Sequence, residues 1–331
     1  TIFCVPGESY LTVIDSLHDA QNEIKTVACR QEGGATNMAE AYGKLTGRPG
    51  VAMVTRGPGA CNGSIGAHTA MQDSTPMVIF IGQVARDQEY REAFQEVDYH
   101  KFYGAICKEV IQVDHAERVP ELVSQAFHVA ASGRPGPVAV SIPEDMQRDM
   151  VDVADARPFQ TVRPEVGPKA MGAFRGQLAS AERPLMILGG AGWSEQACAD
   201  MQAFAETNAV PVAASFRCQD LFDNMHSNYA GELGTSASPA LTQRMRDADL
   251  LIVVGSRLGE MTSGGYSLVN IPVPQQKLIH VYLDSSELGR VYEPDLAIVA
   301  SMESFAAAAR DMEAVAYGKW VEWMRQANQD Y

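Results

Sequence analysis

The chain has 331 residues, and its 46% hydrophobic and 20% charged residues form a balance that excludes a wholly disordered protein. At about 150 residues per domain, this length predicts two domains. Asp and Glu outnumber Lys and Arg by 41 to 26, which gives a formal net charge of −15. A field of that sign repels phosphate backbones and anionic lipid, so we expect neither nucleic acid nor a membrane as the main partner.

The longest apolar runs, such as residues 77–81 and 250–254, are far shorter than the ~20 residues that a membrane span needs. The six cysteines are scattered, without CxxC pairs or histidines at zinc-finger spacing. This usage predicts reduced, buried thiols in a cytoplasmic protein. The chain starts without Met and reaches Pro6-Gly7 as if from inside a strand, so we expect it to be a piece of a longer protein.

The predicted elements of the first half alternate between strands and helices. Runs rich in β-branched residues have the length of buried strands and lie at 24–29, 51–55, 77–81 and 138–142. Between them, apolar residues recur every three or four positions at 35–45 and 119–130, which predicts helices. This alternation is typical of βαβ units and predicts a parallel sheet covered on both faces.

Near residue 150 the apolar period disappears, and proline and charged residues predict a surface linker at 151–167. A second α/β pattern follows, with strands expected at 185–188, 210–214, 250–254 and 278–283 and a helix from Ser194. In the helical pattern of the tail, Trp320, Trp323 and Met324 share one face, which we expect to dock on something outside the chain. The predicted fold is α/β, with two doubly wound parallel-sheet domains.

Glu32 is the first candidate for chemistry, in the run CRQEGGA at residues 29–35. It lies where a predicted strand ends and a helix begins, and the carboxyl ends of parallel strands are where α/β folds hold ligands. The two following glycines allow another molecule to approach the backbone closely. A solvated glutamate that favours the helix dipole explains the same position, so both interpretations stay open.

Two further segments carry weaker signals. The glycine-rich turn TRGPGACNG at 55–63 lacks the third glycine of GxGxxG, and ordinary turn chemistry also explains it. In the loop REAFQEVD at 91–98, Phe94 and Gln95 stand among charges, which is typical of a binding segment or of a plain amphipathic connection.

The second half holds one candidate nucleotide site. Gly189, Gly190 and Gly192 precede a predicted helix, like a turn that cradles a phosphate. Asp284 ends a predicted strand, where it fits either a ribose hydroxyl or the cap of the next turn. The sequence contains no GxSxG, no GxxxxGK[ST] and no HExxH.

The order of the segments is more specific than any one of them. PGESY, CRQEGGA, AEAYGKLTGRPG, VTRGPGACN, QDSTP, GQV, REAFQEVD, SGRPGPV and IPED together closely resemble the thiamine-diphosphate-dependent enzymes of the acetolactate synthase group. The resemblance implies a pyrimidine-binding domain at 1–150. It implies a central, Rossmann-like domain at 168–331, which includes the start of a linker to a further domain.

The resemblance also assigns roles. The counterpart of Glu32 hydrogen-bonds N1′ of the cofactor's aminopyrimidine and favours the imino tautomer that removes the thiazolium C2 proton. The other implied site residues are those around the pyrimidine pocket, Pro6, Gly7, Pro58 and Asn62, and those over the thiazolium and the substrate, Phe94 and Gln95. The catalytic set expected on this basis is Glu32, Gln95 and Phe94.

Two cofactors beyond thiamine diphosphate follow from the same resemblance. Acetolactate synthases bind FAD in the central domain, and Gly189, Gly190, Gly192 and Asp284 are compatible with ADP contacts. The chain reads GSRLGE after Val254, however, and lacks the Asp-Asp-Arg run of FAD-binding relatives. The Mg²⁺ that holds the diphosphate needs a GDG signature that this chain lacks, so we expect its ligands in a missing domain and none here. The chain alone should then bind the cofactor weakly or not at all.

The implied function is decarboxylation of pyruvate or a related 2-oxo acid, followed by transfer of the acyl carbanion equivalent to an acceptor. The active site would form between subunits of a homodimer or tetramer. Glu8, and Gln31 in place of the family's His, leave the acceptor open. The alternatives are another acyl-transferring or decarboxylating thiamine enzyme, and a non-catalytic binding scaffold. A nicotinamide dehydrogenase would need the absent GxGxxG.

Overall fold

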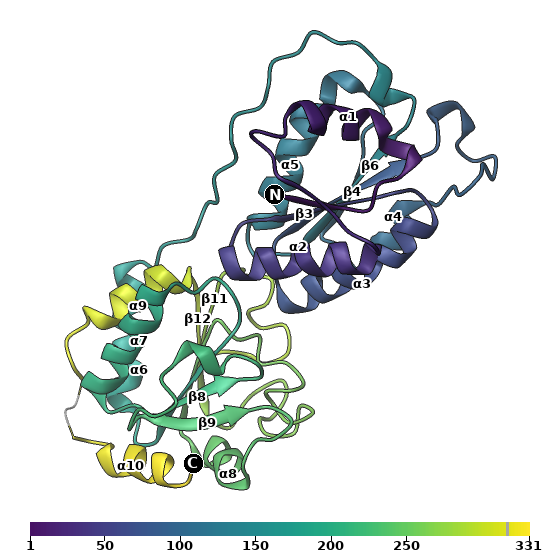
Figure 1. The fold of residues 1–331 in the computed structure, drawn as a ribbon. Coiled ribbons are helices and arrows are strands. Elements are labelled where there is room, and N and C mark those ends of the chain that lie inside the picture. Colours follow the sequence, from purple (N-terminus) through teal and green to yellow (C-terminus); the bar gives the residue numbers. More distant parts are fainter. Residues whose placement is uncertain (316–317) are drawn as a thin grey trace. The chain divides into compact units, whose positions relative to one another are not determined.

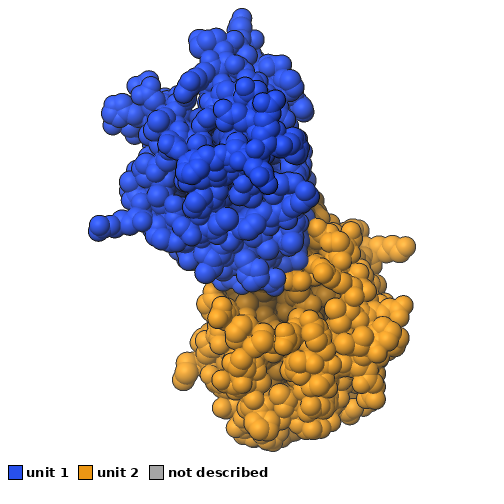
Figure 2. Space-filling view, turned by 90° about the vertical axis from the view of Figure 1, so that its right-hand side faces the viewer, with its two compact units in different colours: residues 1–162 blue, residues 163–331 orange. Residues whose placement is uncertain are grey.

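The computed structural model describes residues 1–315 and 318–331. The chain forms two compact units, Thr1–Val162 and Arg163–Tyr331, which Figure 2 colours separately. Each unit is built on a six-stranded sheet with helices on its faces (Figure 1). The neighbouring strands of both sheets pair in parallel. The α/β class with two parallel-sheet domains, expected from the sequence, is confirmed.

Unit 1 has the strand order β2-β1-β3-β4-β6-β5. Its elements are β1 (Ile2–Cys4), η1 (Glu8–Tyr10), α1 (Leu11–Asp19), β2 (Thr26–Ala28), α2 (Glu32–Thr46), β3 (Gly50–Val54), α3 (Pro58–Asp73), β4 (Met77–Gln83), η2 (Arg86–Gln88), α4 (Tyr99–Tyr103), β5 (Glu109–Gln112), η3 (Ala116–Arg118), α5 (Val119–Ala131), β6 (Pro137–Pro143) and η4 (Met146–Arg148). Helices α2 and α3 lie on one face of the sheet, and α1 and α5 on the other (Figure 1).

Small residues let α2 and α3 pack very closely. A Cβ on Gly66 of α3 would lie 2.4 Å from the Cβ of Thr36 on α2, so no other residue fits there without displacing a helix. Ala39 of α2 and Ala67 of α3 are fully buried against the sheet. The central strands β3 and β6 are buried along their whole length, as the continuous apolar runs in the sequence predict.

Unit 2 has the strand order β12-β11-β10-β7-β8-β9. Its elements are α6 (Pro168–Ser180), β7 (Pro184–Leu188), α7 (Glu195–Asn208), β8 (Val212–Ser215), η5 (Gln219–Leu221), β9 (Tyr229–Leu233), α8 (Pro239–Asp247), β10 (Leu250–Val254), β11 (Lys277–Tyr282), β12 (Leu296–Val299), α9 (Met302–Arg310) and α10 (Val321–Gln329). The order reverses between β7 and β10, as in the doubly wound dinucleotide-binding folds. Residues 149–167 contain neither helix nor strand.

The tryptophan side chains of the C-terminal tail do not lie where the sequence predicts. Trp320 is only 2% exposed in the core of unit 2, where its Nε1 donates to the carbonyl oxygen of Asn208. Trp323 Nε1 donates to the carbonyl oxygen of Pro184 at 2.9 Å. The expectation that this face docks on something outside the chain is wrong, because these side chains close the unit's own core.

The cysteines match the sequence expectation only in part. All six are free. Cys4 and Cys107 are buried, and burial raises the pKa of the Cys107 thiol to about 12. Cys61 on α3 is exposed, so the expectation of buried thiols is wrong there.

A single arginine joins the carboxyl ends of three strands of unit 1. Arg56, just beyond β3, donates from Nη1 to Glu144 beyond β6 at 2.6 Å and from Nη2 to Glu8 beyond β1 at 3.2 Å. Its backbone N–H donates to Ser9 Oγ at 3.1 Å. The arginine is 8% exposed, and its buried Nε has no hydrogen-bond partner among the described residues. These bonds hold the turns after β1 and β3 in a fixed relation.

Replacing this guanidinium should weaken unit 1. We expect Arg56→Met to lower the free energy of unfolding by about 1–3 kcal/mol. Most of this loss should come from Glu144, which is left without its partner, because the Glu8 side chain is largely solvated. The measurement is urea denaturation followed by far-UV circular dichroism. The three tryptophans, Trp193, Trp320 and Trp323, all lie in unit 2, so the transition in their emission should not move.

Arg118 provides the matched control. It forms an exposed pair with Glu121 on the same helical segment, with the charged groups 2.6 Å apart. We expect Arg118→Met to change the unfolding free energy by less than about 0.5 kcal/mol. If both substitutions changed the unfolding free energy equally, the hydrogen bonds of Arg56 would contribute no more to stability than an exposed ion pair does.

Candidate functional site

Glu32 is the first residue of α2, directly beyond the carboxyl end of β2. The side chain of Gln31 caps this helix, since its Oε1 accepts a hydrogen bond from the backbone N–H of Gly34 at 2.8 Å. Glu32 is half-buried. The capped turn therefore presents the carboxylate at the edge of the sheet where α/β folds hold their ligands.

Helix α3 holds one oxygen of this carboxylate and donates no hydrogen bond to the other. Asn62 Nδ2 donates to Glu32 Oε2 at 3.1 Å. A Cβ on Gly59 would lie 3.3 Å from Oε1, so a glycine there keeps this oxygen accessible. No hydrogen bond from a described residue reaches Oε1. The structure thus brings Glu32 and Asn62 together and leaves one carboxylate oxygen ready for a further donor.

The turns after β1 and β3 lie against each other beside this pair. Pro6 is exposed in the first turn, and a Cβ on Gly7 would lie 2.4 Å from the Cβ of Thr55, so only glycine fits. Ser9 Oγ and Thr55 Oγ1 are 2.9 Å apart and share a hydrogen bond. Pro58 is the first residue of α3 and is exposed. Pro6, Gly7 and Pro58 are thus held at the same edge of the sheet as Glu32.

Phe94 and Gln95 lie in the loop between η2 and α4. Gln95 has a φ of 67°, and a Cβ on Gly57 would lie 2.7 Å from the carbonyl oxygen of Gln95. The loop backbone therefore rests on the turn that starts α3. Phe94 is 75% exposed and makes no contact with Glu32 that the structure records. The carboxylate of Glu96 shapes the loop, since it accepts from the backbone N–H groups of Tyr90 at 2.6 Å and Ala93 at 3.0 Å.

Two groups that the sequence analysis missed hold the site together. Tyr99 Oη accepts from the N–H of Gly57 at 3.0 Å and lies 3.4 Å from the carbonyl oxygen of Gly82. Burial raises the pKa of Tyr99 to about 12, so this hydroxyl remains protonated and able to donate. Arg56 is the second. In the sequence, the only signal for Arg56 is its position as a charged residue inside a glycine-rich turn. No sequence signal points to Tyr99.

The predicted residues of unit 2 form a separate group. Gly189 is buried, whereas Gly190 and Gly192 are exposed in the turn between β7 and α7. Asp284 Oδ1 accepts from the backbone N–H of Ser286 at 2.8 Å, which is the cap that the sequence offered as the alternative to a ribose contact.

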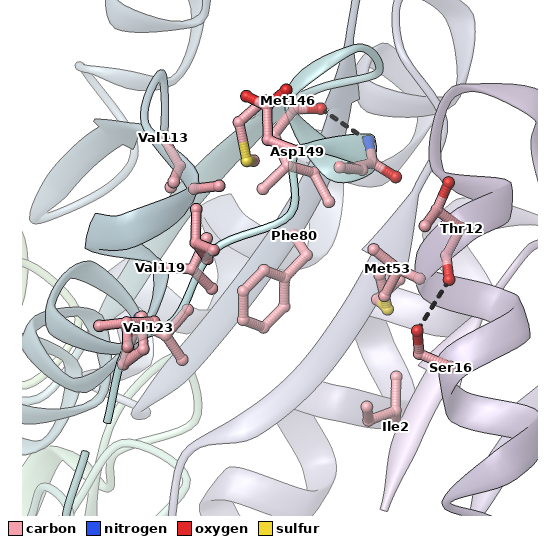
Figure 3. A pocket seen from close by; sticks show the side chains of 17 residues that line it. Ile2, Thr12, Ser16, Met53, Phe80, Val113, Val119, Val123, Met146 and Asp149 are labelled. Atoms are coloured by element: carbon pink, nitrogen blue, oxygen red, sulfur yellow. Dashed lines mark hydrogen bonds between the residues drawn. The ribbon is translucent and has the colours of Figure 1, made fainter. Parts of the chain in front are cut away.

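An apolar cavity of unit 1 lies away from the predicted residues. It measures about 470 Å³ and is lined by residues of α1, α5 and the strands between them, including Thr12, Met53, Phe80 and Val123. Figure 3 shows Phe80 and Val119 directed into it. Because α1 and α5 cover the face of the sheet opposite to α2 and α3, this cavity is separate from the Glu32 site.

Two features are absent from the described part of the chain. Residues 1–315 and 318–331 contain no group of three or more His, Cys, Asp and Glu side chains placed to hold a metal ion. Among the same residues, no helix has the length and apolar character to cross a bilayer.

Comparison with known proteins gives matches along most of the chain. The acetolactate synthase large subunit of Parasynechococcus marenigrum is 33% identical over 310 residues, which cover 91% of this chain and 50% of that protein. The acetolactate synthase isozyme 2 large subunit of Escherichia coli is 33% identical over 307 residues, which cover 92% of the chain and 55% of that protein. The chain thus spans about half the length of the curated relatives that it matches.

Family models match each unit in turn. The N-terminal TPP binding domain of thiamine pyrophosphate enzymes matches residues 1–102, within unit 1. The central domain of the same enzymes matches residues 173–309, within unit 2. The two matches occur in the order that the sequence resemblance implies and together cover more than half of the chain. The chain therefore belongs to the thiamine pyrophosphate enzyme family.

Proposed function

We propose that this chain supplies the pyrimidine-binding domain (1–150), a linker (151–167) and the central domain (168–331) of a thiamine-diphosphate-dependent enzyme. The enzyme would decarboxylate pyruvate or a related 2-oxo acid and transfer the acyl carbanion equivalent to an acceptor, as acetolactate synthases do. The observation that carries this proposal is the Glu32 carboxylate, which Asn62 holds through Oε2 and whose Oε1 accepts no hydrogen bond from a described residue.

The donor set fits the aminopyrimidine of the cofactor. Bound thiamine diphosphate supplies a thiazolium carbon acid whose carbanion attacks a 2-oxo acid. Glu32 would hold a proton between its Oε1 and N1′ of the aminopyrimidine, and Asn62 would fix the carboxylate for that exchange. The turns of Gly7 and Pro58 would line the ring, and the loop of Phe94 and Gln95 would cover the thiazolium and the substrate. These roles are proposals that rest on the position of each residue at one edge of the sheet.

The proposed assembly rests on the resemblance to acetolactate synthases. By that resemblance, a separate domain with the GDG signature would bind Mg²⁺ and the diphosphate. We place that domain on another subunit of a homodimer or tetramer. Exposed apolar side chains on the two helices that carry Glu32 and Asn62 support a subunit contact there: Met38 and Leu45 on α2 are 40% and 86% exposed, and Ile65 on α3 is 57% exposed. The six free cysteines suit the reducing cytoplasm, where we place the enzyme.

Product analysis of the full-length protein tests the reaction. With pyruvate, thiamine diphosphate and Mg²⁺, we expect acetolactate to exceed acetaldehyde. Acetaldehyde alone would identify a simple decarboxylase of the same family. Consumption of neither pyruvate nor other 2-oxo acids would contradict the proposed substrate class.

Exchange of the cofactor's C2 proton tests Glu32 directly. In the assembled protein, we expect Glu32→Gln to slow exchange of the C2 proton into deuterated water by at least ~10²-fold, because an amide cannot exchange a proton with N1′. Nuclear magnetic resonance after acid quench measures the rate. Glu23→Gln, in an exposed turn of the same unit, is the control and should exchange at the wild-type rate. Wild-type exchange in the Glu32→Gln variant would end the assignment.

Phe94 offers a test that separates function from folding. Since its side chain is 75% exposed, we expect Phe94→Ala to change the unfolding free energy by less than about 0.5 kcal/mol. If the ring covers the substrate, kcat/KM should nevertheless fall by roughly 10-fold or more. Tyr90→Ala is the matched control, because Tyr90 is a 91% exposed aromatic residue in the same loop. Equal losses in both variants would place the effect in the loop and not in Phe94.

A further inference from the structure

The strand order of unit 2 predicts a dinucleotide crevice at a definite place. Open α/β sheets bind dinucleotides beyond the carboxyl ends of the strands where the order reverses, here between β7 and β10. Two glycine-containing turns meet at that point, the residues 189–192 after β7 and Gly255 after β10. An adenine dinucleotide such as FAD would pass its diphosphate between these turns and the first turn of α7.

The two turns already touch each other. A Cβ on Gly190, where φ is 74°, would lie 1.9 Å from the carbonyl oxygen of Gly255. A Cβ on Gly255 would lie 2.3 Å from the carbonyl oxygen of Gly189. The approach of one backbone to the other therefore requires these glycines, without any ligand. A Cβ on Gly189 would lie 1.9 Å from Ser215 Oγ, so packing explains that glycine as well.

The indole of Trp193 bridges these two turns. Its Nε1 donates to the carbonyl oxygen of Gly189 at 2.8 Å and lies 3.2 Å from the position of a Cβ on Gly255. The side chain is half-buried and packs against the core of unit 2 that contains Val254 and Met302. The ring thus reaches from the turn after β7 to the turn after β10, the two turns between which the strand order predicts that a diphosphate would pass.

Three polar side chains around the crevice are committed within the protein. Ser194 Oγ accepts from the backbone N–H of Ala197 at 3.2 Å and so caps α7. Arg257, which follows β10, donates to the buried carboxylate of Glu287 at 3.0 Å. Asp284 caps its own turn, as described above. The residues present do not fit the diphosphate or the ribose of FAD.

We propose that Trp193 takes the place of a dinucleotide at the switch point of unit 2, and that this unit binds neither FAD nor another adenine dinucleotide there. The indole stabilises the turn that a bound cofactor would otherwise order. This inference stands apart from the thiamine chemistry, since it concerns only the residues of unit 2.

Two measurements on the full protein test the proposal. First, the protein purified from flavin-replete cells should carry no flavin absorption, and titration of excess protein into a dilute FAD solution should leave the flavin anisotropy at its free value. Stoichiometric binding of FAD by the wild-type protein would overturn the proposal, regardless of the C2-proton exchange rate measured for the Glu32→Gln variant.

Second, substitution should reveal the structural role of the ring. We expect Trp193→Ala to lower the thermal midpoint of unit 2 by about 3–8 °C, read from the emission of Trp320 and Trp323. Trp193→Phe keeps most of the packing and should recover at least half of that shift. A Trp193→Ala protein that melts at the wild-type temperature would show that the indole does not fill the crevice, and would also overturn the proposal.

Discussion

The close approach of α2 and α3 is the constraint on which the candidate site depends. Glu32 and Asn62 belong to different helices, and their hydrogen bond of 3.1 Å requires the first turns of the two helices to lie side by side. Gly66 and the buried alanines permit that approach, because a larger side chain at 66 would meet Thr36. The chemistry proposed for the carboxylate thus rests on small residues that never touch a ligand.

Polar contacts between successive turns fix the rest of the edge of unit 1. Ser9 bridges the turns after β1 and β3, and Arg56 adds the turn after β6. Tyr99 joins α4 to the N–H of Gly57, on which the loop of Gln95 rests. Elements far apart in sequence therefore form one rigid frame, as a site that must hold a ring in a fixed orientation needs.

The two units use the same sheet architecture in different ways. In unit 1 the carboxyl ends of the strands present a carboxylate oxygen to which no described residue donates, together with exposed turns. In unit 2 the corresponding edge is closed by glycine turns in mutual contact and by the indole of Trp193. A common fold thus does not carry a common ligand, because the side chains at the switch point decide whether a crevice exists.

Local patterns in the chain were enough to predict the fold class, most strand positions, and the family to which the chain belongs. Buried parallel strands are local apolar runs, and the order of short segments around Glu32 is specific. Three sets of contacts are visible only in the tertiary structure. Asn62 bonds the Glu32 carboxylate, and Arg56 bonds both Glu8 and Glu144. Trp320 and Trp323 pack in the core of unit 2. The structure also places Trp193 against the glycine turns, where the pattern had favoured a phosphate cradle. These contacts join residues from separate strands and helices. Helix packing and strand order bring these residues together, and no local sequence pattern encodes either.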